Sequence, residues 1–228
     1  VPTALPEGLE ISENGVWIGD YKFKDINNDG VINEQDRDFI GNPLPDFSYG
    51  IGNSFSYKGF DLNIQLSGQY GNEIVNYQRR FLENPRGNTN LFQSALGYAE
   101  LALINPEGPN DYRNVEIVDG DPYMPRIAAS SQSSTSNFRY SDRFLEDGSY
   151  LRIQNISFGY NFPKKWIEKV GLLSAKLYTN LQNVYTFTKY SGYDPEVGSI
   201  NQDALLTGID NGRYPSPRIY TLGLNVNF

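Results

Sequence analysis

A regular alternation of apolar and polar residues over long segments is the feature that most constrains how this chain can fold. Near the end of the sequence, small or amide-bearing residues separate the apolar residues Tyr220, Leu222, Leu224, Val226 and Phe228. Because successive side chains of a strand point to opposite faces, this pattern predicts a strand with one apolar and one polar face. Such a strand, ending on an aromatic residue, is typical of the final strand of an outer-membrane barrel.

Further segments show the same alternation, namely 47–57, 60–70, 149–162 and 176–187. We predict a two-residue hairpin turn at Lys58-Gly59, which pairs Tyr57 with Phe60 and so places the apolar residues of both strands on one face. Within 149–162 the apolar residues change phase. A bulge near Gln154–Asn155, or a start of the strand above the membrane, explains this change.

The lengths of these segments and their polar residues together predict the fold class. Strands of about ten to thirteen residues are long for soluble proteins and match the length needed to cross a bilayer. Their polar positions hold Ser, Gly, Asn, Gln and Thr, with Asp61 as almost the only charge. We therefore predict an all-β fold, an antiparallel transmembrane β-barrel. Because bacterial barrels have even strand numbers of about eight or more, the chain is expected to be an incomplete carboxyl-terminal segment of a barrel, with about five strands.

The connections between the strands differ greatly in length. The segments 71–148 and 188–215 are long and irregular, whereas 58–59 and 163–171 are short. Since outer-membrane barrels have long outer loops and short inner turns, we expect the long segments to be extracellular loops and the short turns, with Phe228, to be periplasmic. Two smaller elements are also predicted, a short strand over Trp17–Lys24 and a short helix within Leu91–Leu103.

The segment 25–36 has the spacing of a calcium-binding loop. Oxygen donors stand at its positions 1, 3, 5, 9 and 12, a carbonyl is expected to serve at position 7, and Gly30 allows the sharp turn. The candidate ligands are Asp25, Asn27, Asp29, Val31 (carbonyl), Asn33 and Asp36. The last of these stands where an EF-hand usually has Glu, and no amphipathic helix precedes the loop. An Asx-rich turn that holds itself together without metal is the alternative.

The composition excludes several functions. The chain has no Cys and no His, which removes thiolate and His-based catalysis, disulfides and the usual zinc sites. Its net charge of -8 argues against nucleic acid as a partner. We therefore predict that it is not an enzyme. A glycosidase using two carboxylates stays open in principle, but no pair stands out. The main alternative to the barrel is a secreted, calcium-stabilised β-sandwich that binds carbohydrate.

Several segments resemble one known family, the SusC/RagA-like TonB-dependent outer-membrane transporters. The resembling segments are GDYKFKDINNDGVINEQDR (19–37), IGNPLPDFSYG (40–50), SDRFLEDGSYLR (141–152) and TKYSGYDPEV (188–197). The resemblance implies a barrel of about 22 strands in the cell outer membrane, with a plug and a TonB-contacting segment outside this sequence. It also implies a SusD-like surface lipoprotein as partner and an oligosaccharide or peptide as substrate.

Two tyrosines within the last of these segments are candidates for contact with a substrate or a partner. Tyr190 and Tyr193 follow the end of a predicted strand. Their rings could stack on a sugar, whereas packing within the loop or at the membrane interface is the more common role of such residues.

Overall fold

The computed structural model describes residues 17–30, 32–85, 90–107, 111–127, 137–198 and 206–228. The chain divides into two compact units. We call Gly41–Asn76 with Leu145–Phe228 the sheet unit, and Val1–Ile40 with Tyr77–Phe144 the loop unit. Among the described residues, no helix is long and apolar enough to cross a membrane.

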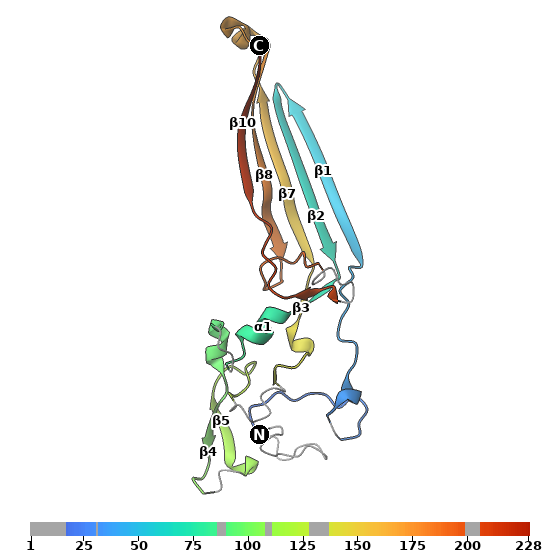
Figure 1. Ribbon diagram of the computed structural model, residues 1–228, viewed down its shortest axis with the longest axis vertical. Coiled ribbons are helices and arrows are strands. Elements are labelled where there is room, and N and C mark those ends of the chain that lie inside the picture. Colours follow the sequence, from blue (N-terminus) through green and yellow to red (C-terminus); the bar gives the residue numbers. More distant parts are fainter. Residues whose placement is uncertain (1–16, 31, 86–89, 108–110, 128–136, 199–205) are drawn as a thin grey trace. The chain divides into compact units, whose positions relative to one another are not determined.

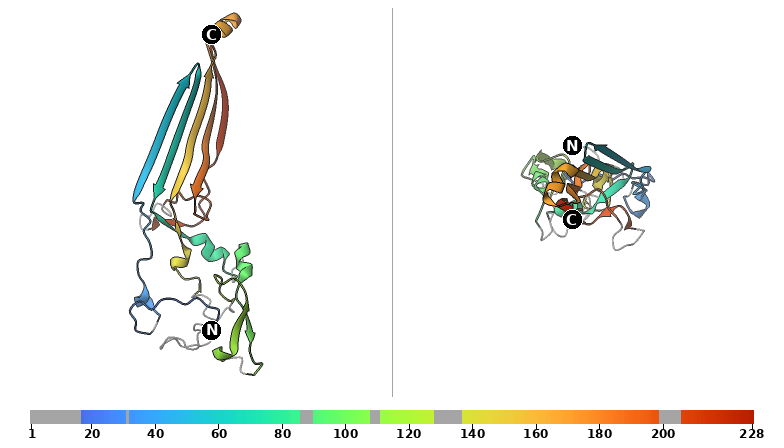
Figure 2. Two further views of the ribbon diagram at one scale, coloured as in Figure 1. Left: turned by 180° about the vertical axis from the view of Figure 1, so that it is seen from behind. Right: turned by 90° about the horizontal axis from the view of Figure 1, so that it is seen from above.

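Five long antiparallel strands dominate the sheet unit (Figure 1). Their order is β1 (Phe47–Tyr57), β2 (Phe60–Tyr70), β7 (Tyr150–Asn161), β8 (Ser174–Thr188) and β10 (Ile219–Asn227). Figure 2 shows them side by side in a single layer. The five predicted strands are therefore confirmed, and the bounds of β1 and β2 coincide with those predicted from the alternation.

The β1–β2 hairpin has the predicted turn. Lys58 and Gly59 both have positive φ, at 48° and 89°, as a type I′ turn requires, and Tyr57 pairs with Phe60. A Cβ on Gly59 would lie 2.8 Å from the carbonyl oxygen of Asn161. Both the backbone angle and the close approach of β7 therefore require glycine here.

The predicted bulge is also present, and it restores the phase of the apolar residues. Gln65 of β2 pairs with Asn155 of β7, whereas the next residue, Leu66, pairs with Ile153. Gln154 is the extra residue of β7, so the apolar residues before and after it fall on the same face. In the adjacent β8 the register shifts at the same level, beside Asn183 with its φ of 51°.

Shorter elements occupy both ends of the sheet unit. The predicted compact turn between β7 and β8 consists of α3 (Lys164–Ile167) and the 3-10 turn η5 (Glu168–Val170). At the other end, β6 (Leu145–Asp147), β3 (Glu73–Asn76) and β9 (Ile209–Asp210) form a small sheet in that order. The buried apolar side chains of the unit are Ile74, Tyr150, Ile167, Ala175 and Tyr190.

The loop unit contains more regular structure than the irregular loop predicted from its composition. Its elements are η1 (Glu34–Asp36), α1 (Tyr77–Leu82), η2 (Gln93–Gly97), β4 (Glu100–Leu103), η3 (Tyr112–Asn114), β5 (Val115–Asp119) and η4 (Asp142–Phe144), with β4 and β5 paired antiparallel. The helical prediction for Leu91–Leu103 holds only for the 3-10 turn η2, because Glu100 begins a strand that pairs with β5.

The short strand predicted over Trp17–Lys24 is wrong. The chain turns there instead, with Gly19 at a φ of 86° and the amide of Asp20 bonded to the carbonyl of Trp17. The Asp20 carboxylate closes this turn by accepting a bond from the Trp17 amide at 2.8 Å. Local side-chain to backbone bonding of this kind competes with strand formation.

Candidate functional site

One face of the five-stranded sheet is apolar and exposed, and we call it the apolar face. The register places Phe55, Leu62, Phe158, Thr179 and Leu222 in one row across it. The side chains at both ends of that row are open, with Phe55 59% and Leu222 76% exposed. An apolar surface of this extent is unusual in a soluble monomer and typical of a surface that contacts lipid or another protein.

Aromatic rings lie at both ends of the apolar face. At the loop end, Phe47 and Tyr70 stack with ring centroids 5.4 Å apart. At the turn end, the ring of Phe60 lies 4.4 Å from that of Tyr160. Aromatic belts at the two edges of an apolar band are the usual arrangement at membrane interfaces.

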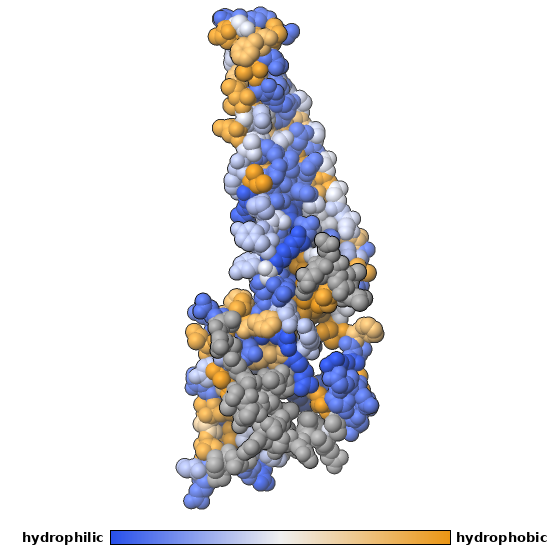
Figure 3. All heavy atoms as spheres, in the orientation of Figure 1, coloured by the Kyte–Doolittle hydropathy of each residue, from blue (hydrophilic) through white to orange (hydrophobic). Residues whose placement is uncertain are grey.

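The opposite, polar face carries small and amide side chains, as expected, and hydrophilic residues cover most of the middle of the sheet in Figure 3. Near the turn end, Asp61 accepts hydrogen bonds from Ser56 (2.8 Å) and Asn161 (2.7 Å) and pairs with Lys176 at 3.0 Å. The predicted isolated charge therefore has a basic partner. The alternation pattern alone did not place that lysine beside it.

A second basic residue, Arg152, is buried at the loop end of the polar face. Its Nε donates to Thr186 on β8 at 3.0 Å, and its two terminal nitrogens bind Asp194 and Glu196. Asp194 also accepts bonds from the backbone amides of Glu196 and Ser216. We call this group the arginine clasp. It joins β7 and β8 to the segment that follows β8 and to the residues that lead into β10.

The electrostatics of the clasp favour a charged Asp194. Burial acts to raise the pKa of this carboxyl, but the two backbone amides and the Arg152 guanidinium outweigh it and lower the pKa below its ordinary value of 3.8. The unfolded chain then binds a proton more readily than the folded one. The stabilisation is therefore present above pH 3.8 and is lost as the pH falls through the lowered pKa.

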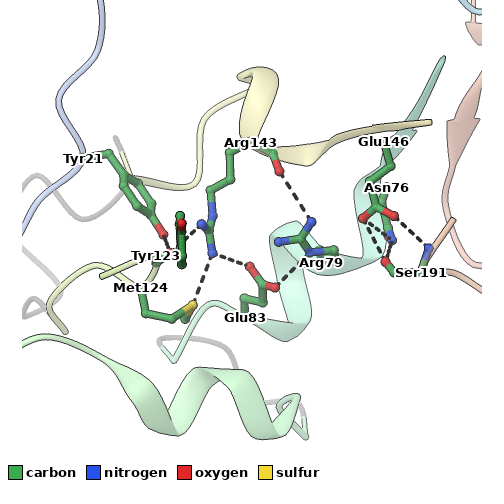
Figure 4. A network of polar contacts seen from close by, with 9 residues as sticks. All are labelled: Tyr21, Asn76, Arg79, Glu83, Tyr123, Met124, Arg143, Glu146 and Ser191. Atoms are coloured by element: carbon green, nitrogen blue, oxygen red, sulfur yellow. Dashed lines mark hydrogen bonds and ion pairs between the residues drawn. The ribbon is translucent and has the colours of Figure 1, made fainter. Parts of the chain in front are cut away.

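The same end of the sheet unit positions the two candidate tyrosines. Tyr190 is buried and its hydroxyl donates to Asp210 at 2.5 Å, so it packs within the loop. Tyr193 is 70% exposed and remains available for a ligand or partner. Between them, Ser191 binds Glu146 through both its amide and its hydroxyl, at 2.8 Å each, and Asn76 donates to the same carboxylate (Figure 4).

The loop unit is held by a separate buried cluster, also shown in Figure 4. Arg143 forms an ion pair with Glu83 at 2.8 Å, and Glu83 in turn binds Arg79 at 2.9 Å. The Arg143 guanidinium lies 4.7 Å from the centre of the Tyr21 ring, whose hydroxyl donates to the carbonyl of Tyr123. Burial raises the pKa of Tyr21, and Arg143 opposes that effect.

A related ion pair fixes the segment that precedes the predicted calcium loop. Asp20 pairs with Arg126 at 2.9 Å, and both side chains are almost fully buried. Asn137, which is wholly buried, donates to Asp20 and accepts from the amide of Tyr21. These contacts hold residues 19–21 against Arg126 and Asn137, which lie 106 and 117 residues from Asp20 in the chain.

The predicted calcium ligands that the structure describes lie in a compact loop, while Val31 lies outside the described residues. Asp25 accepts from the amides of Asn28 (2.7 Å) and Gly30 (2.8 Å), and Asp36 from those of Ile26 (2.9 Å) and Asn33 (2.7 Å). The bonds to Asn33 and Ile26 lower the pKa of Asp36, so the carboxyl is readily ionised. The 3-10 turn η1 (Glu34–Asp36) forms the end of the loop. Among the described residues, no three acidic side chains converge closely enough to form a metal cluster by themselves.

Sequence reasoning missed the arginine clasp and the Arg143 cluster. Their members are far apart in the chain: 60 residues separate Glu83 from Arg143, and 102 separate Tyr21 from Tyr123. The only signal was that Arg143, Glu146, Arg152, Asp194 and Glu196 all fall within the segments that carry the family resemblance. The structure explains that coincidence in part, because within the sheet unit it brings residues 145–152 and 188–197 into contact.

Outer-membrane β proteins share the combination of an antiparallel sheet, an exposed apolar face and aromatic edges. Comparison with known proteins narrows this class. The chain is 35% identical to the TonB-dependent receptor P3 of Formosa agariphila over 98% of the chain and 20% of that receptor. It is 27% identical to the TonB-dependent receptor SusC of Bacteroides thetaiotaomicron over 95% of the chain and 18% of that receptor.

Solved structures show the same fold. A chain of the RagAB peptide importer in its open-open state matches 97% of this chain and 21% of its own length, with a TM-score of 0.65 and 21% identity. The closed-closed state matches 81% of this chain and 17% of its own length, with a TM-score of 0.56 and 24% identity. No protein-family model matches the sequence.

The resemblance read from the sequence motifs is therefore confirmed: over nearly its whole length, the chain is homologous to TonB-dependent receptors, SusC among them. It spans about a fifth of the length of the curated relatives it matches. TonB-dependent receptors are outer-membrane proteins, and they are receptors and transporters rather than enzymes. The prediction that the chain is not an enzyme is confirmed.

The two acidic partners of Arg152 provide a test of the clasp. Replacing the buried Asp194 by Asn should lower the free energy of unfolding by about 3 kcal/mol, because it removes the buried negative charge that neutralises the Arg152 guanidinium. Replacing Glu196 by Gln should cost at most about 1 kcal/mol, because 53% of that side chain is exposed. Urea unfolding of the full-length receptor in detergent, with proteolysis of residues 189–216 as a local readout, measures both. Equal losses of unfolding free energy in the two variants would contradict the view that Asp194 is the stronger partner of Arg152.

Proposed function

We propose that this chain forms part of the wall of a transmembrane β-barrel in an energy-coupled importer of the outer membrane. The observation that carries the proposal is the exposed apolar face on five strands of nine to fifteen residues. Strands of about ten tilted residues span a bilayer. A secreted β-sandwich would bury this face against a second sheet, and the TonB-dependent relatives offer that alternative no support.

Closure of the barrel requires strands outside this chain. Within the described residues, β1 and β10 are the edges of the five-stranded sheet. Lipid offers no hydrogen bonds to open edges, so in the membrane each must pair with another strand. We propose that each of these edges pairs with a further strand of the full receptor, so that residues 1–228 form one part of the barrel wall.

The orientation follows from the lengths of the connections. The short turns 58–59 and 163–171 lie at one end of the sheet, beside Phe228, and we place them in the periplasm. The segments 71–148 and 188–215 then belong to the cell exterior, with the 25–36 loop. Long outer loops and short inner turns are the usual arrangement of such barrels.

The relatives support a proposal for the partners and for the substrate class. SusC-type receptors and the RagAB importer support a SusD-like or RagB-like surface lipoprotein as partner, and the TonB complex as the source of energy. RagAB is a peptide importer, and an oligosaccharide is the other substrate class of the proposal. Tyr193, exposed in the segment after β8, is the aromatic candidate for contact with the substrate or the lipoprotein.

Uptake by cells tests the proposal directly. Cells that lack the receptor gene should fail to take up one class of substrate, measured with fluorescent oligosaccharides and with fluorescent peptides supplied separately. The full-length receptor should restore uptake only when the TonB complex is intact, and a neighbouring lipoprotein should copurify with it. Restoration without TonB would exclude an energy-coupled importer.

The apolar face supplies a second test. Arginine in place of Leu222, near the middle of β10, should destabilise the receptor in a bilayer by about 2 to 4 kcal/mol, because it places a charge in hydrocarbon. The same replacement of Thr221, the adjacent residue on the polar face, should cost far less. Urea unfolding of the full-length receptor in lipid vesicles measures the difference. Equal effects would show that the two faces do not separate lipid from the interior.

We also propose that the 25–36 loop binds calcium through Asp25, Asn27, Asp29, Asn33 and Asp36, with the Val31 carbonyl. The spacing of the donors supports this role, and backbone amides hold Asp25 and Asp36 within one loop. The ion would be structural and would offset the mutual repulsion of the carboxylates. The alternative is the amide-bonded turn acting alone.

Chelation distinguishes these alternatives. Removing calcium from the full-length receptor should make the 25–36 loop more sensitive to protease, and Asp25→Ala should have the same effect with calcium present. Asp38→Ala, which changes the same charge just outside the loop, is the matched control. A protease-resistant loop with no bound ion by metal analysis would show that the turn needs no metal.

A further inference from the structure

The turn between β7 and β8 is a short helical element with an amphipathic composition. Residues 163–171 contain Lys164, Lys165 and Lys169 but only one acidic residue, Glu168, for a net charge of +2 in a chain of net charge -8. Ile167 is the one side chain of α3 that is buried. It anchors the turn and leaves the other side chains outside.

Apart from Pro163 and Glu168, the exposed side chains of this turn are basic or apolar. All three lysines are exposed, and none forms an ion pair with another described residue. Trp166 is 61% exposed, and Val170 and Leu173 are each 70% exposed. At this end of the sheet hydrophobic and hydrophilic residues lie next to each other on the surface (Figure 3).

The turn adjoins the edge of the apolar face. The last full row of that face, Tyr57, Phe60, Tyr160, Leu177 and Leu224, lies at the same end of the sheet. Figure 1 shows the helix of the turn just beyond the strands, beside the carboxyl terminus. A further lysine, Lys58, lies in the hairpin turn at this end, with its ammonium 5.1 Å from the centre of the Tyr57 ring.

We infer that this basic turn binds the headgroups of anionic phospholipids in the leaflet that surrounds the turn end of the sheet. The inference rests on the proposed function, because the apolar face must be in the bilayer for the turn to reach the headgroups. Lysines attract anionic headgroups, tryptophan prefers the interface, and exposed Val and Leu insert below it. The charge of the turn, opposite to that of the whole chain, makes an anionic surface the complementary partner.

Labelling with photoreactive lipids tests this inference at the turn itself. The full-length receptor is placed in nanodiscs that carry photoreactive phosphatidylglycerol or photoreactive phosphatidylcholine of the same chain composition. After chymotryptic digestion, mass spectrometry gives the ratio of the two labels on residues 163–171. We expect a ratio well above one in the native receptor, reduced about fivefold for each lysine replaced in a Lys164/Lys165/Lys169→Gln variant. Higher salt should also reduce it.

Two further variants serve as controls. Replacing the same three lysines by Arg should keep the ratio high, since the charge is retained. Replacing Lys22, Lys24 and Lys189 by Gln changes the net charge equally at other positions and should leave the ratio unchanged. A ratio near one in the native receptor, or no change in the turn variant, would overturn the inference and leave the proposed function intact. A receptor that stays soluble without detergent or lipid would overturn both.

Discussion

Backbone hydrogen bonding within the long antiparallel sheet is the constraint on which the rest of this structure depends. A segment in contact with lipid must satisfy its N–H and C=O groups internally, and a ladder of paired strands does so. Once the strands pair, their alternation decides which side chains form the apolar face. The register from β1 to β10 keeps the rows of apolar residues continuous, and the bulge at Gln154 corrects the one place where the sequence slips by a residue.

The charged residues Arg152 and Asp61 on the polar face of the sheet each bind a partner of opposite charge. Arg152 lies on the polar face and is neutralised by Asp194 and Glu196, while Asp61 has Lys176. Burying an unpaired charge would cost several kcal/mol. The two ion pairs of Arg152 also connect the sheet to the segment after β8, which is fixed to the sheet by ionic and hydrogen bonds rather than by an apolar core.

The two ends of the sheet unit thus differ in chemistry. At the loop end, carboxylates such as Glu146 and Asp210 organise the chain through bonds to amides and hydroxyls. At the turn end, exposed lysines and aromatic rings face outward. This difference is what the proposed importer requires, since in that proposal one end presents loops to a substrate and a partner, while the other adjoins a lipid surface and the periplasm.

The sequence by itself determined the strands, the hairpin turn and the bulge, because period-two alternation and Lys58-Gly59 act locally and leave few alternatives. It also identified the family through short motifs. Only the tertiary structure decided the positions that depend on distant partners. Trp17–Lys24 turns rather than extends because Asp20 bonds to Trp17, Arg126 and Asn137, and Tyr190 is buried because Asp210 accepts its hydroxyl. Local patterns predict local geometry, whereas ion pairs between residues far apart in the chain form only after the chain has folded.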